Sequence, residues 1–499
     1  MKGDFRAQCT GIKRRDPACI IIMAIGLVFG LWYIKNSCCD VVYSDYIRLV
    51  ESYLPDVTDP DKFFVPDILT RVPAAFFARA VNVKLFGFSV TFDRLLTLSG
   101  FFLCSLILFI YVRGKNLGAL AYAILIFLLY ALNKWEIFIN GSAWAHVVSF
   151  GLFFSYYYMF EAFALKGERK LFVPLCLMPF LILLFAGEYI ASYSAVMLLF
   201  SALFFIFPGN ERVDLKGAGL RPDEQKEAEH RRGDLKSGAI KRSDKRRTMA
   251  FVFLSVLVTL SLYLISRSFA VWEHAGSTEL GFFDFIKRDP MFIPRFFVKS
   301  FAGTVMGGET ISSLSQYLSS GSLDLFTLIL GAVVILSYIL ALFLFFSERM
   351  YEETVFPMIL LLSGGFNHVL VTAGRWIFED EGYALSSRYG AQFVIGILGV
   401  FLIYFLYLKK REAKGFIKGS LIILIILFLA GNCYTCYQEI GKMPYREANY
   451  ERMAEAVRNY ENYSDDELCE ILEWHKDPRI LKDAIEILKE NRLNVFRGQ

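Results

Sequence analysis

Long apolar segments alternate with shorter polar connections along almost the whole chain. A helix needs about 20 residues to cross a hydrocarbon core of about 30 Å. Backbone groups in lipid must be paired within their segment, and no alternating strand pattern is present, so we predict helices. The predicted spans are residues 18–34, 95–112, 117–132, 143–160, 171–187, 190–207, 250–267, 323–346, 355–373, 388–408 and 416–435. The sequence therefore predicts an all-α polytopic membrane protein with about eleven transmembrane helices.

Composition and loop charge set the expected orientation. The chain is 55% hydrophobic, with 49 Phe and 26 Tyr, which is unlike a soluble enzyme. Basic residues gather at 13–15, 208–249 and 409–411, and an excess of Lys and Arg marks cytoplasmic loops. We predict a multi-pass protein of the cell membrane with a retained N-terminal anchor, a cytoplasmic N-terminus and an extracytoplasmic C-terminus. The net charge of +4 reflects this loop bias, so no nucleic-acid partner is expected.

Polar stretches divide the chain into a membrane module and a tail. The predicted segments are a module over 1–435, with a first extracytoplasmic loop at 35–93, a charged cytoplasmic linker at 208–249 and an outer loop at 268–322, and a helical outer cap at 436–499. Two stretches of the first loop, 45–54 and 66–88, are amphipathic with helical spacing. We predict that they are interfacial helices, with the polar side toward water and the apolar side toward lipid.

Acidic residues near the predicted outer ends of the spans are the candidate catalytic groups. Asp45 lies just past the first span, where a carboxylate can act as a general base on a hydroxyl. The alternative for Asp45 is a helix N-cap. Asp40 is a candidate second acid or metal ligand, or else a solvated loop residue.

Two further acids lie in short outer turns. Glu136 lies between the third and fourth spans, next to Trp135 and ahead of His146. Trp135 and His146 are candidate substrate-binding residues, although an interface anchor and a packing residue are the alternatives. Glu188 occupies the tight turn between the fifth and sixth spans. An acid flush with the membrane needs either a partner or a function.

Basic residues on the same predicted side are candidates for binding phosphate. Arg388 and Tyr389 lie at the outer start of the tenth span. A guanidinium beside a helix N-terminus suits a phosphate oxygen, and the alternative is a side chain that reaches lipid headgroups. Arg375, Arg295 and Lys299 are secondary phosphate candidates. The chain has no glycine-rich phosphate loop, no His-Glu-x-x-His and no Gly-x-Ser-x-Gly, which disfavours nucleotide-driven transport, zinc protease and serine hydrolase chemistry.

The order of these features resembles the GT-C membrane glycosyltransferases, and is most similar to bacterial members related to the GtrII group of O-antigen glucosyltransferases. The motifs that carry the resemblance are Tyr43-Ser44-Asp45-Tyr46, the stretch from Trp135 to Ser142, Gly187-Glu188 and Ser387-Arg388-Tyr389. The family often has an adjacent acidic pair where this chain has the single Asp45. If the chemistry needs two acids, Asp40, Glu136 or Glu188 must supply the second.

The resemblance implies a sugar donor carried on a polyprenyl phosphate within the membrane lipids, and a cell-surface glycan as acceptor. Asp45 would deprotonate the acceptor hydroxyl, which attacks the anomeric carbon with inversion, and Arg388 would hold the leaving phosphate. No cofactor is required by this scheme. A divalent cation, magnesium or manganese, remains open, since the sequence offers no clear ligand set.

Two other functions remain open at this point. A lipid-linked glycan flippase or transporter would use broken helices, and residues 363–365 predict such a break in the ninth span. An O-antigen polymerase or ligase would use arginines and a histidine in a large outer loop. The 268–322 loop carries Arg295, Lys299 and His274.

Overall fold

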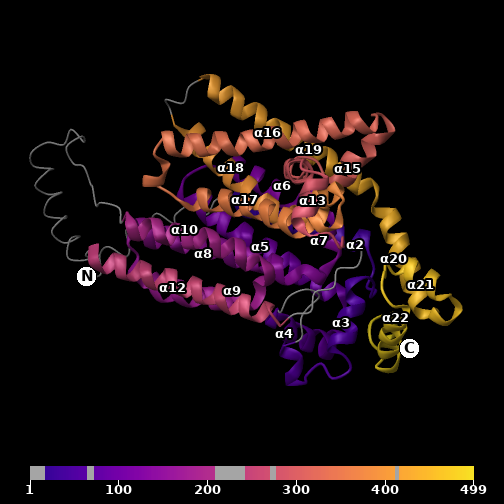
Figure 1. Ribbon diagram of the computed structural model, residues 1–499. Coiled ribbons are helices and arrows are strands. Elements are labelled where there is room, and N and C mark those ends of the chain that lie inside the picture. The colour runs from indigo at the N-terminus through magenta and orange to yellow at the C-terminus, as the bar shows by residue number, and fades with distance from the viewer. Residues whose placement is uncertain (1–16, 65–71, 208–241, 270–276, 411–414, 499) are drawn as a thin grey trace, which may run out of the picture.

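The computed structural model describes residues 17–64, 72–207, 242–269, 277–410 and 415–498 (Figure 1). Helices dominate this part of the chain, which contains no strand. Ten of its stretches are long and apolar enough to cross a membrane. They are Pro17–Ser37, Val90–Gly114, Ala119–Ile139, Gly141–Lys166, Arg169–Ile206, Arg246–Arg267, Ser320–Ser347, Phe356–Phe378, Ser387–Lys409 and Gly415–Gly441. The prediction of an all-α polytopic membrane protein is therefore confirmed.

The structure has ten apolar stretches although eleven spans were predicted, because the stretch Arg169–Ile206 contains two of the predicted spans. A straight helix of its 38 residues would be about 57 Å long, nearly twice the hydrocarbon thickness. It instead contains α9 (Phe172–Ala186) and α10 (Ile190–Ile206), joined by the turn η6 (Gly187–Tyr189). Gly187 has φ 51° and ψ −131°, a region of backbone space that glycine enters readily. Both predicted spans therefore lie in one stretch.

The remaining spans each contain one main helix. These helices are α2 (Pro17–Ser37), α5 (Val90–Gly114), α6 (Ala119–Tyr130), α8 (Trp144–Lys166), α12 (Arg242–Arg267), α16 (Ser320–Ser347), α17 (Phe356–Arg375), α18 (Gly390–Lys409) and α19 (Gly415–Gly441). Every residue of α18 from Gly390 to Tyr404 is buried, so this helix lies at the centre of the bundle.

Helices α17 and α18 meet through glycine. A Cβ on Gly364 would lie 2.3 Å from the Gly396 Cα, so only glycine permits this approach. Small residues allow membrane helices to pack closely. Helix α17 also runs unbroken through residues 363–365. The predicted helix break at these residues is therefore wrong, because Gly364 serves packing there and does not interrupt the helix.

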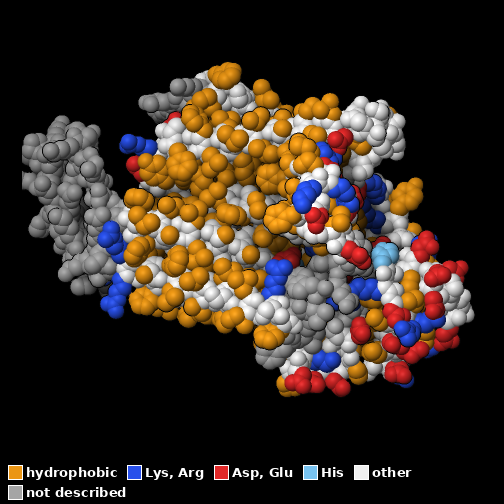
Figure 2. Space-filling view, viewed as in Figure 1, with side chains coloured by type: hydrophobic (Ala, Val, Ile, Leu, Met, Phe, Trp, Pro, Cys, Tyr) orange, Lys and Arg blue, Asp and Glu red, His pale blue; other side chains and the backbone are white. Residues whose placement is uncertain are grey.

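The short helices gather at one end of the bundle, on the right of Figure 1. They include α3 (Asp45–Tyr53), α4 (Pro73–Val81), α20 (Met443–Arg458), α21 (Asp465–Ile471) and α22 (Pro478–Glu490). Hydrophobic side chains cover the visible flank of the bundle, and acidic side chains are concentrated at the end that carries the short helices (Figure 2). An apolar flank of this kind is typical of a membrane-embedded bundle, and we call the end that carries the short helices the polar end.

The apolar side of α3 faces protein and not lipid, which corrects the prediction for residues 45–54. Tyr46, Leu49 and Val50 are at most 1% exposed and belong to the main hydrophobic core. Helix α22 packs against α3, and the backbone N–H of Ser44 donates to the carbonyl of Leu472 at 2.8 Å. An amphipathic pattern specifies a buried face but not the surface that buries it, and here that surface is the C-terminal cap.

The other segments agree with the predicted layout only in part. Helix α4 does present exposed apolar side chains, with Phe77 57% exposed. The helical cap is present, but α19 continues to Gly441, past the predicted boundary at 435. In the 268–322 loop lie α13 (Phe282–Arg288), α14 (Phe292–Ala302) and α15 (Gly308–Ser313). Most of the predicted 208–249 linker, and His274, lie outside the described residues.

Candidate functional site

The site lies just after the C-terminal end of α6, which is a short helix. This helix has 12 residues, about 18 Å at 1.5 Å per residue, which is less than the bilayer core. The Lys134 ammonium donates to the carbonyls of Leu128 (3.0 Å) and Ala131 (2.9 Å) and to Oδ1 of Asn133 (2.8 Å). These bonds satisfy carbonyls that the helix end leaves open. The chain then turns into α7 (Trp135–Ile139), which carries Glu136.

Glu136 and Arg388 form the centre of the site, and we call them the central pair. The Arg388 Nε donates to Oε1 of Glu136, and the Ser387 hydroxyl donates to Oε2 at 3.2 Å. The turn η12 (Ser387–Tyr389), just before α18, holds Ser387 and Arg388 in place. The Glu136 side chain is 16% exposed and the Arg388 side chain 52%. Because this ion pair uses Nε, the two terminal guanidinium nitrogens keep donor hydrogens for a further group.

Asp45 is the third member of the site. It is the first residue of α3, and it lies close enough for its charge to act on both Glu136 and Arg388. The bond from Ser44 to Leu472 fixes the start of α3 against the cap. Three predicted residues from distant parts of the sequence therefore meet at one place.

Two adjoining cavities meet at these residues. The inner cavity has a volume of about 350 Å³ and the outer one about 630 Å³. Both are lined by Asp45, Arg48, Glu136, Tyr383, Arg388, Tyr389 and Lys476. Both cavities therefore open onto the central pair.

The inner cavity also contains the other predicted residues of the span ends. Glu188, His146 and Arg375 line it together with Tyr189 and Tyr389. The rings of His146 and Tyr189 meet edge to face at 4.8 Å. The Arg375 guanidinium lies 5.6 Å from the Tyr389 ring centre, a cation–π distance. Glu188, Arg375 and Tyr389 also interact electrostatically.

The outer cavity is walled partly by the C-terminal cap. His475 and Lys476 reach it from the loop after α21, and Glu309 reaches it from α15. Burial raises the pKa of Glu309, and the charges of Glu439 and Glu136 raise it further. The cap is therefore part of the site and not a separate appendage.

Asp40 stands apart from this cluster. Its Oδ1 accepts hydrogen bonds from the backbone N–H groups of Val90 (2.6 Å) and Thr91 (3.2 Å), at the start of α5. A carboxylate at this position satisfies the open amides of a helix N-terminus. Asp40 is not among the residues that line either cavity, so its contacts in the described structure are those of a helix cap.

Arg295 and Lys299 also lie away from the cavities, in α14. Arg295 bonds to Glu381 (2.7 Å) and Asp289 (2.6 Å). Lys299 bonds to Glu381 (2.5 Å) and to Asp324. Both cations are thus paired with carboxylates, and a phosphate would have to compete with these partners.

Trp135 connects the site to the cap. The Arg446 guanidinium lies 3.4 Å from the centre of its indole, and Arg446 also bonds to Glu439 at 2.5 Å. Stacking of this kind stabilises a buried guanidinium. Trp135 therefore positions the cap over the segment that carries Glu136. The described residues contain no group of three or more His, Cys, Asp or Glu side chains that could hold a metal ion.

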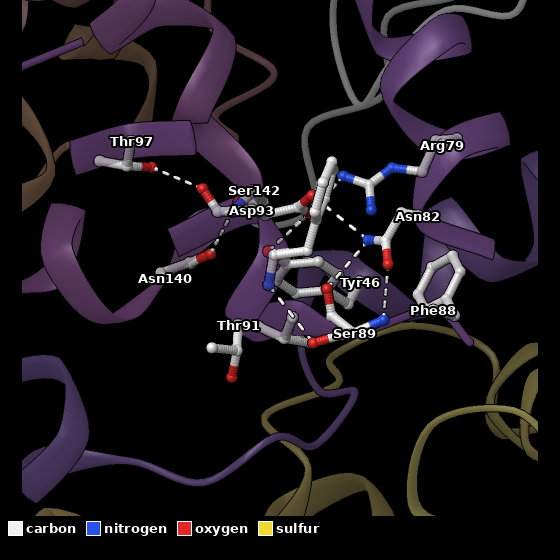
Figure 3. Close-up of polar contacts among 12 residues, drawn as sticks. Tyr46, Arg79, Asn82, Phe88, Ser89, Thr91, Asp93, Thr97, Asn140 and Ser142 are labelled. Carbon is white, nitrogen blue, oxygen red and sulfur yellow. Dashed lines mark hydrogen bonds and ion pairs between the residues drawn. The ribbon is translucent and has the colours of Figure 1, made fainter. Parts of the chain in front are cut away.

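A buried cluster that the sequence did not reveal surrounds Tyr46, the residue after Asp45 (Figure 3). Asp93 and Arg79 form an ion pair in which both side chains are 0% exposed. The Tyr46 hydroxyl donates to Asp93 at 3.0 Å, and Asn82 donates to Asp93 at 3.4 Å. Tyr46 follows Asp45 directly, so this cluster anchors α3 from inside. An Asp-Arg dipeptide entering an apolar span is a signal that could have flagged it.

Other lining residues were also missed, for a different reason. Gln392 and Asn140 line the inner cavity, and Lys476 lines both cavities. A neutral amide in an apolar span is no rare event, and a lysine in a polar tail has no distinguishing pattern. Only the packing of distant segments identifies such residues.

No protein-family model matches the chain, and neither the curated proteins nor the solved structures contain a match.

Proposed function

We propose that the protein is an integral membrane glycosyltransferase that moves a sugar from a polyprenyl-phosphate donor to a glycan acceptor outside the cytoplasm. The observation that carries the proposal is the convergence of Asp45, Glu136 and Arg388 on one pair of cavities at the polar end of an apolar bundle. A base and a phosphate-binding cation at a membrane boundary suit a reaction between a lipid phosphate and a polar acceptor.

In this reaction the Asp45 carboxylate takes the proton of the acceptor hydroxyl. The hydroxyl oxygen then forms a bond to the anomeric carbon, and the bond from that carbon to the phosphate oxygen breaks, with inversion. The lipid phosphate leaves with the electron pair and is stabilised by Arg388. Glu136 positions Arg388 through the Nε contact, so its role is orientation of the guanidinium rather than proton transfer.

Neither alternative function gains a specific observation. Helix α17 is continuous at the glycines that suggested a broken transporter helix. Arg295 and Lys299, which suggested a polymerase or ligase loop, are paired with Glu381 and other carboxylates. The glycosyltransferase remains the function that uses the greatest number of the clustered residues.

A transfer assay tests the proposal. Purified protein in nanodiscs is given radiolabelled polyprenyl-phosphate sugars and a crude surface-glycan acceptor. We expect Asp45→Asn to lower transfer by about 10²–10⁴-fold, the usual effect of removing a general base. The matched control is Asp56→Asn, which changes an exposed aspartate of the same loop outside both cavities. Transfer at the wild-type rate in Asp45→Asn would remove Asp45 as the base, and bound lipid without transfer from any donor would favour a flippase.

A further inference from the structure

Gln392 carries a side-chain amide with no protein partner. It lies in the first turn of α18, is 1% exposed, and lines the inner cavity. Neither its Oε1 nor its Nε2 hydrogen-bonds to any residue in the described part of the chain. Buried side-chain amides nearly always have a partner, since an unpaired one loses its hydration without replacement. The two open groups therefore indicate that something polar enters the inner cavity.

The backbone at Gln392 is held firmly. The Asn367 Nδ2 donates to the Gln392 carbonyl at 3.0 Å. One helical turn further along α18, Gly396 meets Gly364 at van der Waals limits. The close packing of α17 and α18 therefore fixes the backbone of α18 at this point. Gln392 is thus carried into the cavity wall by a rigid element, which is a feature of prebuilt ligand sites.

The surroundings of the amide favour an uncharged sugar ring. The walls of the same cavity contain the aromatic residues Phe150, Tyr189 and Phe378, which suit the apolar faces of a ring. Glu188 and Arg375, which line the same cavity and interact electrostatically, oppose one another in sign. A volume of about 350 Å³ is at the small end of ligand pockets, so one sugar fits better than a chain.

We propose that Gln392 binds the hydroxyl groups of the donor sugar, and that this sugar is an uncharged hexose. The inference rests on the proposed function, because the donor is the lipid-linked sugar of that reaction. An amide offers one acceptor and two donor hydrogens, which matches neighbouring hydroxyls that both give and receive hydrogen bonds. With the phosphate at Arg388, the sugar extends into the inner cavity and the acceptor approaches from the outer one.

Binding measurements on the full-length protein in nanodiscs test this subsite without requiring turnover. The probes are a bare polyprenyl phosphate, its glucosyl, galactosyl and N-acetylglucosaminyl esters, and its galacturonosyl ester, which carries a negative sugar. The variant is Gln392→Leu, which removes both polar groups at similar size. The matched control is Gln438→Leu, since the Gln438 amide lies on α19 outside the cavities and bonds to Tyr434 at 3.0 Å.

We expect the wild type to bind at least one uncharged ester about tenfold more tightly than the bare lipid, as one or two hydrogen bonds would give. Gln392→Leu should lose this gain and keep its affinity for the bare lipid, and Gln438→Leu should match the wild type. A sugar gain that survives in Gln392→Leu, or tightest binding of the galacturonosyl ester, overturns the subsite alone. If no lipid phosphate binds the wild type, the proposed function fails and the subsite fails with it.

Discussion

Two arginine–carboxylate pairs at the polar end of the bundle differ sharply in their exposure. Arg79 and Asp93 are both 0% exposed, and the carboxylate accepts further bonds from Tyr46 and Asn82. In the central pair, Arg388 is 52% exposed and Glu136 16%, and both line the two cavities. The same two chemical groups therefore occupy a closed setting in one case and an open one in the other.

The difference separates a structural role from a functional one. A closed pair cannot exchange its partner, and removing one member leaves an uncompensated charge in the interior. A half-exposed guanidinium can keep one contact and still receive a phosphate oxygen. Substitutions in the closed pair should therefore reduce stability, whereas substitutions in the central pair should reduce ligand binding or transfer.

The largest expected effect is on the closed pair. Asp93→Asn removes the buried charge opposite Arg79 and should destabilise the fold by about 3–5 kcal/mol. Thermal unfolding in detergent, followed by size-exclusion chromatography, measures the loss. The matched control is Glu379→Gln, which breaks the exposed pair with Arg288 and should leave the unfolding temperature unchanged. A wild-type unfolding temperature in Asp93→Asn would show that the closed pair is not an anchor.

Removing the half-exposed guanidinium of Arg388 should reduce transfer and leave stability nearly unchanged, the reverse of the effect expected for Asp93→Asn. Arg388→Ala should lower transfer by about 10²–10³-fold, as expected when a group that stabilises developing charge is lost. The unfolding temperature should change little, because half of the side chain already faces solvent. Arg388→Lys is the informative companion, since it keeps the charge and loses the forked geometry. Loss of folding in Arg388→Ala, with transfer per folded molecule preserved, would reverse the assigned roles.

Substituting Lys134 should have an effect of intermediate size, because Lys134 is buried and its ammonium donates to no carboxylate in the described structure. Its three hydrogen bonds all go to neutral acceptors at the end of α6. Lys134→Met should leave these acceptors open and destabilise the protein by about 1–3 kcal/mol. Transfer should fall as well, since α7 and Glu136 follow directly. An unfolding temperature equal to that of the wild type would mean that water replaces the ammonium.

The sequence predicts the apolar helices well and their mutual contacts poorly. Hydropathy places the long helices because each span responds to the bilayer locally. The amphipathic pattern of 45–54 also predicts α3, yet its apolar side meets α22 rather than lipid. The pattern is local, whereas the partner lies more than four hundred residues away, and nothing in the periodicity of α3 distinguishes a protein surface from a lipid one.

The candidate site follows the same rule. Asp45, Glu136, Glu188 and Arg388 could be singled out because charge at a span end is rare and costly. Their grouping depends on contacts such as Arg388 with Glu136, which are far apart in sequence. Arg295 was a secondary phosphate candidate, but it is paired with Glu381 and Asp289. Charge type is visible in a sequence, whereas the partner that cancels a charge is visible only in the fold.

The smallest expected effect is a pH dependence at the rim of the open site. Burial, together with the charges of Glu439 and Glu136, raises the pKa of Glu309 above its ordinary value of 4.5. The folded state therefore holds this proton more tightly than the unfolded state. The resulting stability is fully present below pH 4.5 and is lost as the pH rises through the raised pKa.

Glu309→Gln removes this titration and keeps the shape of the side chain. Its unfolding temperature, measured between pH 4 and 8, should vary less than that of the wild type and should be slightly higher at neutral pH. Glu51→Gln, at an exposed position of α3, is the matched control and should follow the wild-type curve. If Glu309→Gln also follows that curve, the Glu309 carboxylate is hydrated in the folded protein and its pKa is not raised. If the unfolding temperature of Glu309→Gln varies less with pH than that of the wild type, Glu309 is shielded from water, and the boundary between the closed pair and the solvent-filled cavities lies at this residue.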